Sequence, residues 1–259
     1  MTTTIGKPIG AALAAAAAAF ALAACGDDNG GNGGSGTANS DLPQGSEQVD
    51  LNPADFTTKI DNPYWPMQPG SRWVYHETDQ EGADQRVVVT VTQRTKKIAN
   101  GIEARVVRDV VSDTKSGEPV EITDDWYAQD SDGNIWYMGE ATAEYENGKI
   151  VTRAGSFEAG VDGAQPGIIM PAKPEVGQTY RQEYYKGKAE DEGEIVSLDA
   201  QAEVPFGHFD PAVMTQDTNP LEPKVLEFKF YAKDVGPVLA VSVSGGSDRE
   251  ELLSYTKGG

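Results

Sequence analysis

Apolar and polar residues alternate along most of the chain after residue 70. The run 85–95, with the letters QRVVVTVTQRT, is rich in β-branched residues, which favour strands, and turn dipeptides such as Asn100-Gly101 separate such runs. No helical period of 3.6 residues extends beyond about two turns. The pattern predicts strands at 72–76, 85–95, 102–113, 120–129, 134–144, 149–157, 179–185, 192–198, 212–215, 225–231, 238–243 and 250–255.

These strands predict a single all-β domain. Short links favour antiparallel neighbours over parallel crossovers, and about twelve strands rarely stay in one flat open sheet. We therefore expect about twelve mostly antiparallel strands that form a curled sheet, a half-barrel or a barrel across residues 51–259. About 210 residues are ample for one core of this kind.

One segment interrupts the alternation. Residues 158–178 read EAGVDGAQPGIIMPAKPEVGQ, with Pro166, Pro171 and Pro174 and an apolar cluster at 168–170. A loop of this length inside a compact domain is usually functional or packs down as a cover. We expect a plug that seals an open end of the sheet, a lid over a pocket, or a loop that docks a partner.

Residues 126–140, with the letters WYAQDSDGNIWYMGE, form the strongest predicted hairpin. The Asp-Gly pair at the centre supplies a turn because glycine accepts a positive φ. A two-residue turn would place Ala128 opposite Tyr137. A three-residue turn with a left-handed Gly133 would place Tyr127 opposite Tyr137 instead, and this slip reassigns which aromatic side chains share a face.

In the second register Trp126 faces Met138, and Trp126 shares one face of the sheet with Trp136. Aromatic residues on a twisted sheet are usually part of the core, yet a concave apolar surface for a lipid or a sugar would also use them. The candidate ligand-binding residues are Trp126, Tyr127, Trp136, Tyr137 and Met138.

The polar residues of the same turn have a calcium-like spacing. Asp130, Asp132 and Asn134 read D-x-D-x-N, which opens a calcium loop. The rest of the motif fails, because Ile135 stands where the loop needs glycine and Ala141 stands where it needs a bidentate acid. Asp and Asn are also the ordinary residues of turns. We therefore expect a plain turn, with no metal and no cofactor.

Residues 1–24 are typical of a secretion signal, with Lys7 before an apolar run that is too short and too alanine-rich for a membrane span. The run ends in the letters LAAC, residues 22–25, which resemble the lipobox of bacterial lipoproteins. The resemblance implies cleavage before Cys25 and a diacylglycerol on its sulfur. The partner of the chain is then the lipid bilayer of the cell membrane or an outer membrane, with the body on the extracytoplasmic side.

Residues 25–50 consist of Cys25 and a stretch rich in Gly, Asn and Asp. The stretch has almost no apolar side chain to offset the entropy of ordering, so we expect a flexible tether. About 25 residues of this kind reach about 25–30 Å on average. The tether would hold the folded body, residues 51–259, off the bilayer.

Two motifs in the body resemble those of uncharacterised secreted and envelope proteins of bacteria. Residues 69–75 read PGSRWVY and are similar to their P-G-x-x-W-x-Y start. Residues 230–238 read FYAKDVGPV and are similar to their Y-A-x-G-V-G-x-V hairpin, with Asp234 in place of a glycine. The resemblance implies a curled antiparallel sheet, similar to that of the lipoprotein-localisation carriers. Neither motif carries a catalytic residue, so no activity follows from it.

The net charge of the chain excludes one class of partner, the nucleic acids. The formal net charge is −20 at pH 7, and such a surface repels phosphate backbones, so nucleic-acid binding is not expected. The single cysteine permits no intrachain disulfide.

The sequence contains no familiar catalytic constellation. It has no G-x-S-x-G elbow, and its two histidines, His76 and His208, lie far apart. The neighbours Asp124 and Asp125 should point to opposite faces of a strand, so they cannot act as a pair. A glycosidase would need acids from different strands at a set separation. We therefore expect a protein that is not an enzyme.

Together, these observations predict a membrane-held binding or carrier domain for an apolar or carbohydrate ligand, or for a partner protein. We expect a monomer. A structural or assembly role in the envelope is the first alternative, and a hydrolase that uses two cross-strand carboxylates is the second.

Overall fold

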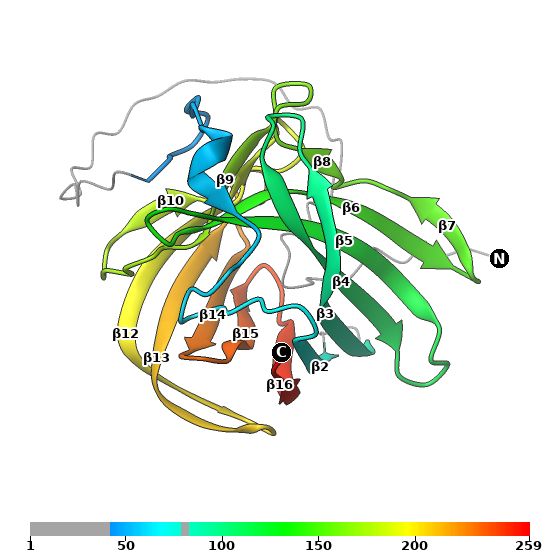
Figure 1. The fold of residues 1–259 in the computed structure, drawn as a ribbon. Coiled ribbons are helices and arrows are strands. Elements are labelled where there is room, and N and C mark those ends of the chain that lie inside the picture. The colour runs from blue at the N-terminus through cyan, green and yellow to red at the C-terminus, as the bar shows by residue number, and fades with distance from the viewer. Residues whose placement is uncertain (1–41, 79–82) are drawn as a thin grey trace, which may run out of the picture.

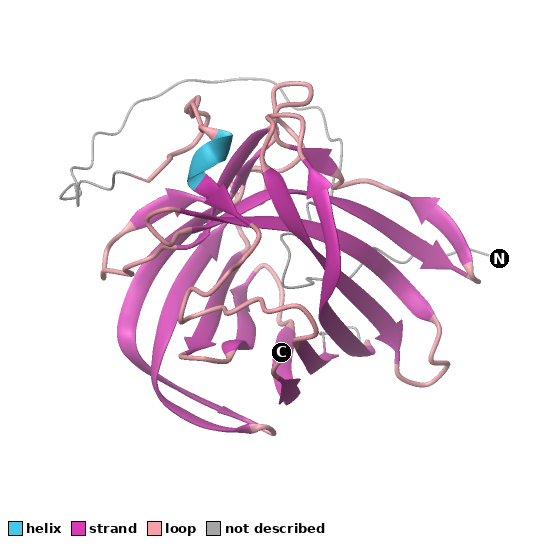
Figure 2. Cartoon of the chain, viewed as in Figure 1, coloured by secondary structure: helices cyan, strands magenta, loops and turns pink. Residues whose placement is uncertain are grey.

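The computed structural model describes residues 42–78 and 83–259. The predicted signal peptide, Cys25 and most of the predicted tether lie outside the described residues. The described part forms one antiparallel sheet of 16 strands that curls almost into a closed barrel (Figure 1). Its single helical turn is the 3-10 element η1, Pro53–Asp55 (Figure 2). The all-β prediction is confirmed.

Long strands with short turns make up most of the sheet, as the alternation predicts. The strands are β1 Phe56–Thr57, β2 Arg72–Thr78, β3 Asp84–Lys97, β4 Glu103–Asp113, β5 Pro119–Asp130, β6 Ile135–Glu146, β7 Lys149–Thr152, β8 Phe157–Glu158, β9 Gln165–Met170, β10 Thr179–Arg181, β11 Glu183–Tyr184, β12 Glu192–Val204, β13 Gly207–Thr218, β14 Leu226–Ala232, β15 Gly236–Ser244 and β16 Arg249–Thr256.

The two ends of the sheet meet at a seam formed by one short piece of chain. The strand order runs β10-β12-β13-β14-β15-β16-β2-β3-β4-β5-β6-β9-β11. The two end strands, β10 and β11, are separated along the chain by Gln182 alone. Gly167 of β9 permits the close approach, because a Cβ at this position would collide with the backbone of Arg181 and Gln182. The chain itself therefore joins the two ends of the nearly closed barrel.

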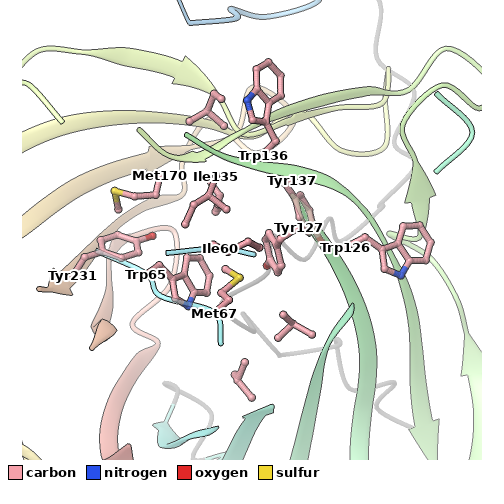
Figure 3. Packing of buried hydrophobic residues seen from close by; sticks show 14 of the residues in the cluster. Ile60, Trp65, Met67, Trp126, Tyr127, Ile135, Trp136, Tyr137, Met170 and Tyr231 are labelled. Atoms are coloured by element: carbon pink, nitrogen blue, oxygen red, sulfur yellow. The ribbon is translucent and has the colours of Figure 1, made fainter. Parts of the chain in front are cut away.

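The interior of the barrel is filled by the segment that precedes β2. Ile60, Trp65 and Met67 are buried there, and Ile60 and Met67 form a β-bridge. The ring of Trp65 lies 5.6 Å from that of Tyr127 on β5 and 6.0 Å from that of Tyr231 on β14. β5 and β14 lie far apart in the strand order, on different walls of the barrel. Trp65 therefore occupies the interior space between these walls (Figure 3).

The prediction that residues 158–178 form a long loop is wrong. Residues 165–170 are strand β9, which pairs with β6 on one side and with β11 on the other. The apolar cluster at 168–170 is buried in the core. Pro166 lies at the start of β9, while Pro171 and Pro174 follow its end. Prolines at strand ends remove few ladder hydrogen bonds, so they mark the borders of this strand.

The predicted hairpin at 126–140 adopts the second of its two registers. Tyr127 pairs with Tyr137, and Gly133 has a φ of 99°. A register shift follows between Asp125 and Tyr127, where β6 carries an extra residue next to Gly139, whose φ is 123°. This bulge keeps the next residues of β6 in phase with the interior face of β5.

Candidate functional site

Inward-facing positions of the barrel carry acidic side chains on strand after strand. On β5 the residues alternate, so Asp125 lies in the interior and is buried, while Asp124 lies on the outer face. Asp124 accepts hydrogen bonds of 2.8 Å from Arg94 and from Arg108 on that outer face. The predicted opposite orientation of the two neighbouring aspartates is confirmed.

We call the acidic residues that face one another inside the barrel the interior acids. Several are cross-strand partners, such as Asp125 with Glu140 and Glu77 with Glu250. Lys229 lies among them, with its Nζ 2.9 Å from Asp217 and 3.6 Å from Glu227. The interior acids are Glu77, Asp109, Glu121, Asp125, Glu140, Glu183, Asp191, Asp217, Glu227 and Glu250.

Burial raises the pKa of several interior acids, among them Glu77, Asp109 and Glu140. Desolvation, reinforced by neighbouring acids, raises the pKa of Glu77 to about 8, and desolvation raises that of Asp109 to about 7. Oδ1 of Asp109 and both carboxyl oxygens of Glu250 accept no hydrogen bond. An isolated buried carboxylate is unfavourable, so such a group takes up a proton or gains a positive partner.

Asp125 and Glu140 share the hydroxyl group of Tyr137, at 2.9 Å and 2.8 Å. A hydroxyl group donates one hydrogen, so the second contact requires a proton on one of the two carboxyl groups. Burial raises the pKa of Glu140 to about 8, which supplies that proton near neutral pH. Both acids are less than 5% exposed. A glycosidase pair must flank a substrate bond in a cleft, and this buried pair presents no such face.

A pocket of about 240 Å³ opens at the seam of the barrel. Glu183 is the buried acid of its lining, with 1% of its surface exposed. The carboxyl group of Glu183 is buried and is hydrogen-bonded to that of Asp191. Glu183 therefore lies between the pocket and the other interior acids. Its lining includes Gly45, Arg181, Glu183, Tyr184, Glu190 and Glu192.

Arg181 fixes a strap, residues 43–47, along one side of this seam pocket. Its Nη1 donates to the carbonyl oxygens of Gly45 at 2.8 Å and Glu47 at 2.7 Å. Its Nε and Nη2 donate to the carbonyl oxygen of Pro166, at 3.1 Å and 2.8 Å. The guanidinium group is buried, and these neutral carbonyl groups are its hydrogen-bond partners. Arg181 is therefore a clamp for the strap.

The aromatic residues predicted to bind a ligand divide between the two faces of the sheet. Tyr127 and Tyr137 lie in the interior with ring centroids 5.1 Å apart. Trp126 and Trp136 point away from the interior (Figure 3), where Lys96 lies 4.4 Å from the Trp126 ring and Phe56 packs edge-on against Trp136 at 5.9 Å. Met138 is fully buried. Ligand binding by these residues stays a prediction.

The proposed calcium loop is organised by its first aspartate. Oδ1 of Asp130 accepts from the backbone N–H groups of Asp132, Gly133 and Asn134 at 2.8–3.0 Å. Its Oδ2 accepts from Asn134 Nδ2 at 2.8 Å and from Trp136 Nε1 at 2.7 Å. These contacts use the carboxylate as the acceptor that holds a hairpin turn.

Other possible ligands for a metal do not converge. Residues 42–78 and 83–259 contain no group of three or more His, Cys, Asp or Glu side chains that could hold a metal ion. His76 pairs with Asp84 and His208 pairs with Glu203, each at 2.8 Å.

The sequence interpretation missed Glu183 and the clamp Arg181. A usable signal lies in the predicted strand 179–185, where Arg181, Gln182 and Glu183 follow one another without an apolar residue. All three are buried. A run of polar residues inside a strand of a compact domain is a sign of a functional or paired interior.

Comparisons with known proteins add little to this description. No protein-family model matches the chain, and no curated protein matches it. A solved structure described as "a putative lipoprotein from Parabacteroides distasonis ATCC 8503" is similar, with 13% identity and a TM-score of 0.39, over 74% of this chain and 98% of that chain. A likeness at this level assigns no function. Within the described part of the chain, no helix has the length and apolar character needed to cross a membrane.

Proposed function

We propose that the protein is a lipid-anchored envelope lipoprotein whose barrel is a non-catalytic binding domain, with the seam pocket as its ligand site. The carrying observation is the seam pocket itself, whose lining brings Arg181, Glu190 and Glu192 together beside the strap. A concave pocket with a few convergent polar groups is the ordinary form of a small-molecule site.

The N-terminal sequence supports the anchored location. Leu22-Ala23-Ala24-Cys25 has the form of a lipobox, and two or three acyl chains on Cys25 would attach the protein stably to a bilayer. The strap beside the seam pocket, residues 43–47, lies within the predicted tether 25–50 and is held on the barrel by Arg181. The tether is therefore shorter than predicted, and a ligand in the pocket would bind within about 21–25 Å of the membrane on average.

The filling of the barrel changes the ligand class expected from the sequence. Trp65 and Met67 occupy the interior space that an apolar ligand would need. The lining of the seam pocket includes Arg181, Glu183 and Glu190, which suit a polar ligand better than a lipid chain. We therefore still propose that the barrel binds a ligand, but we propose a polar ligand in place of an apolar one.

A structural or assembly role is a second candidate, favoured by one feature of the surface. The β6–β7 hairpin projects from the body of the barrel (Figure 1). Ile150 and Val151 on β7 are about half exposed, at 45% and 51%. An apolar edge strand is a template for pairing with another chain. A single stoichiometric protein partner in a pull-down, lost with Ile150→Lys, would favour this role.

Native mass spectrometry of the detergent-solubilised full-length protein tests the binding role. Protein purified from its own envelope should carry a small molecule that is absent from a Glu192→Gln variant at the pocket lining and retained by a Glu175→Gln variant. Glu175 is exposed and lies outside the pocket lining, so it is a matched control. Identical spectra without a bound molecule for all three proteins would contradict the proposed function. In parallel, Cys25→Ser should move the protein from the membrane fraction to the soluble fraction.

A further inference from the structure

We infer that the seam of the barrel is a pH-sensitive latch, which is closed while the carboxyl groups of Glu183 and Asp191 share a proton and loosens when both are ionised. The inference concerns the barrel itself and holds whether or not the seam pocket binds a ligand. It depends on the place of this acid pair in the fold, on the small number of other bonds at the seam, and on the charges around the pair.

The acid pair joins the two ends of the sheet. Glu183 belongs to β11, which pairs with β9, whereas Asp191 directly precedes β12, which pairs with β10. These two pairs of strands are the opposite ends of the strand order. The hydrogen bond between the two carboxyl groups therefore crosses the seam. The backbone carbonyl oxygen of Asp191 also accepts from the N–H groups of Gln182 at 2.7 Å and Glu183 at 3.3 Å.

Few other bonds hold β11 in place. The strand has two residues, and its ladder with β9 pairs Glu183 with Pro166 and Tyr184 with Gln165. Pro166 has no backbone N–H group, so it cannot donate to this ladder. An element with so few bonds can open locally while the rest of the protein stays folded. The interaction between the two acids therefore decides whether β11 stays in place.

The contact between the two acids depends on a proton. An ionised carboxylate only accepts hydrogen bonds, so a hydrogen bond between two carboxyl groups requires a proton on one of them. Both oxygens of Glu183 and Oδ1 of Asp191 are shielded from solvent. If both groups were ionised, they would repel each other in surroundings that screen charge weakly. Loss of the shared proton thus turns an attraction across the seam into a repulsion.

The groups that face Glu183 favour its protonated form. They are the carboxyl groups of Asp191 and of Glu140 on β6, the hydroxyl group of Tyr137 on the same strand, and the ammonium group of Lys229 on β14. Desolvation, reinforced by the two neighbouring acids, raises the pKa of Glu183 well above its usual range. The attraction of Lys229 offsets only part of this effect.

The groups that face Asp191, besides its partner acid, are Lys229 and Glu227 on β14 and Asp217 on β13. Lys229 is already shared, because its Nζ lies 2.9 Å from Asp217 and 3.6 Å from Glu227. Arg181, which is also buried at the seam, donates to carbonyl oxygens of the strap instead. Desolvation outweighs the attraction of Lys229 and raises the pKa of Asp191 to about 7. The pair therefore keeps at least one proton at neutral pH.

Opening of the seam should increase with pH. In an open seam both acids would face water and ionise near their usual pKa values of about 4, whereas in the closed seam the pair keeps protons to about pH 7 or above. The closed state binds more protons in this range, so it loses stability relative to the open state as the pH rises. Each proton released on opening raises the open fraction about tenfold per pH unit. Because Glu183 lines the seam pocket, the pocket would change shape with the latch.

Hydrogen–deuterium exchange of the detergent-solubilised full-length protein tests the inference. The exchange rates are measured between about pH 5 and pH 8, and each is divided by the intrinsic rate of an unfolded chain at that pH. The protection of the Gln182 and Glu183 amides should fall by at least about tenfold per pH unit. At every pH it should stay below the protection of the β4 amides, because the seam opens locally.

Glu183→Gln is the decisive variant, because its side-chain amide can donate to Asp191 at every pH and has no proton to lose. It should reduce the fall in seam protection over this pH range by at least about tenfold. Glu175→Gln, which replaces an exposed acid, is the matched control and should leave the fall unchanged. Circular dichroism checks that each variant is folded, and Asp191→Asn takes the place of Glu183→Gln if that variant does not fold.

Three results would overturn the inference. The first is seam protection in the wild type that does not change with pH. The second is the same fall with pH in Glu183→Gln or Asp191→Asn as in the wild type. The third is equal protection of the seam amides and the β4 amides, since opening would then involve the whole barrel and not the latch.

Discussion

Replacing Asp109 by asparagine removes one buried negative charge from the barrel interior and keeps the size of the side chain. Asp109 is 2% exposed, and its Oδ1 accepts no hydrogen bond. Desolvation, with a smaller repulsion from Glu121, raises its pKa from 3.8 to about 7. A difference of this size corresponds to about 4 kcal/mol of unfavourable free energy for the ionised group in the folded state.

The sign of the effect depends on pH. Because the folded pKa of Asp109 exceeds the unfolded one, the native state binds more protons between pH 3.8 and about 7. The contribution of this group to the free energy of unfolding therefore falls as the pH rises through that window. At about pH 8 the Asp109→Asn protein should be more stable than the wild type by up to about 4 kcal/mol. Near pH 4 the two should be nearly equal.

Urea unfolding at both pH values measures the difference, and Asp124→Asn is a matched control on the adjacent strand. Burial alone would raise the pKa of Asp124, but hydrogen bonds from Arg94 and Arg108 outweigh it and lower that pKa. The control should therefore lose stability at neutral pH and approach the wild type in acid, with the opposite sign. An Asp109→Asn protein that gains nothing at about pH 8, or gains equally at both pH values, would refute the reasoning.

Three further variants test the packing and the strap. Trp65→Ala should lower the free energy of unfolding by about 3–5 kcal/mol in urea, because it empties the space between Tyr127 and Tyr231; a loss below about 1 kcal/mol would contradict the filled interior. Gly139→Ala should cost about 2 kcal/mol or more, since φ is 123° and the new Cβ would collide with the backbone of residue 157; a neutral effect would contradict the bulge. Arg181→Met should speed cleavage after residue 47 by a glutamate-specific protease, and unchanged cleavage would contradict the clamp.

Local patterns explain why most strands could be predicted from the sequence. The predicted strand 120–129 is β5, Pro119–Asp130, and the Asp-Gly turn gave the register that pairs Tyr127 with Tyr137 as one of two alternatives. Alternation along β5 also gave the opposite directions of Asp124 and Asp125, because a strand has a fixed period of two residues. These features depend on neighbouring residues alone.

Long-range features of the fold could not be predicted in this way. The seam forms because β10 and β11 pair with strands at opposite ends of the sheet order. Trp65 lies in a proline-rich segment without alternation, and nothing local indicates that this segment crosses the barrel interior. Residues 158–178 lack alternation because β9 is buried on both faces, so its apolar run was interpreted as a cover.

The sequence predicted a ligand site at residues 126–140, whereas the structure has a pocket at the seam. This difference also arises from contacts between segments that are far apart in the sequence. Aromatic residues cluster locally at 126–140, whereas the seam pocket combines the strap at 43–47 with Arg181, Glu183 and Glu192. Its members are brought together by barrel closure. The interior acids belong to strands that are far apart in the sequence, and single acids at inward positions resemble ordinary surface acids until the sheet is closed.

A crystal structure of the protein purified from its own envelope tests the central claim most directly. The account predicts a bound polar small molecule in the seam pocket, beside the strap and in contact with the lining residues Glu190 or Glu192. A pocket that contains only water in such a crystal would contradict it.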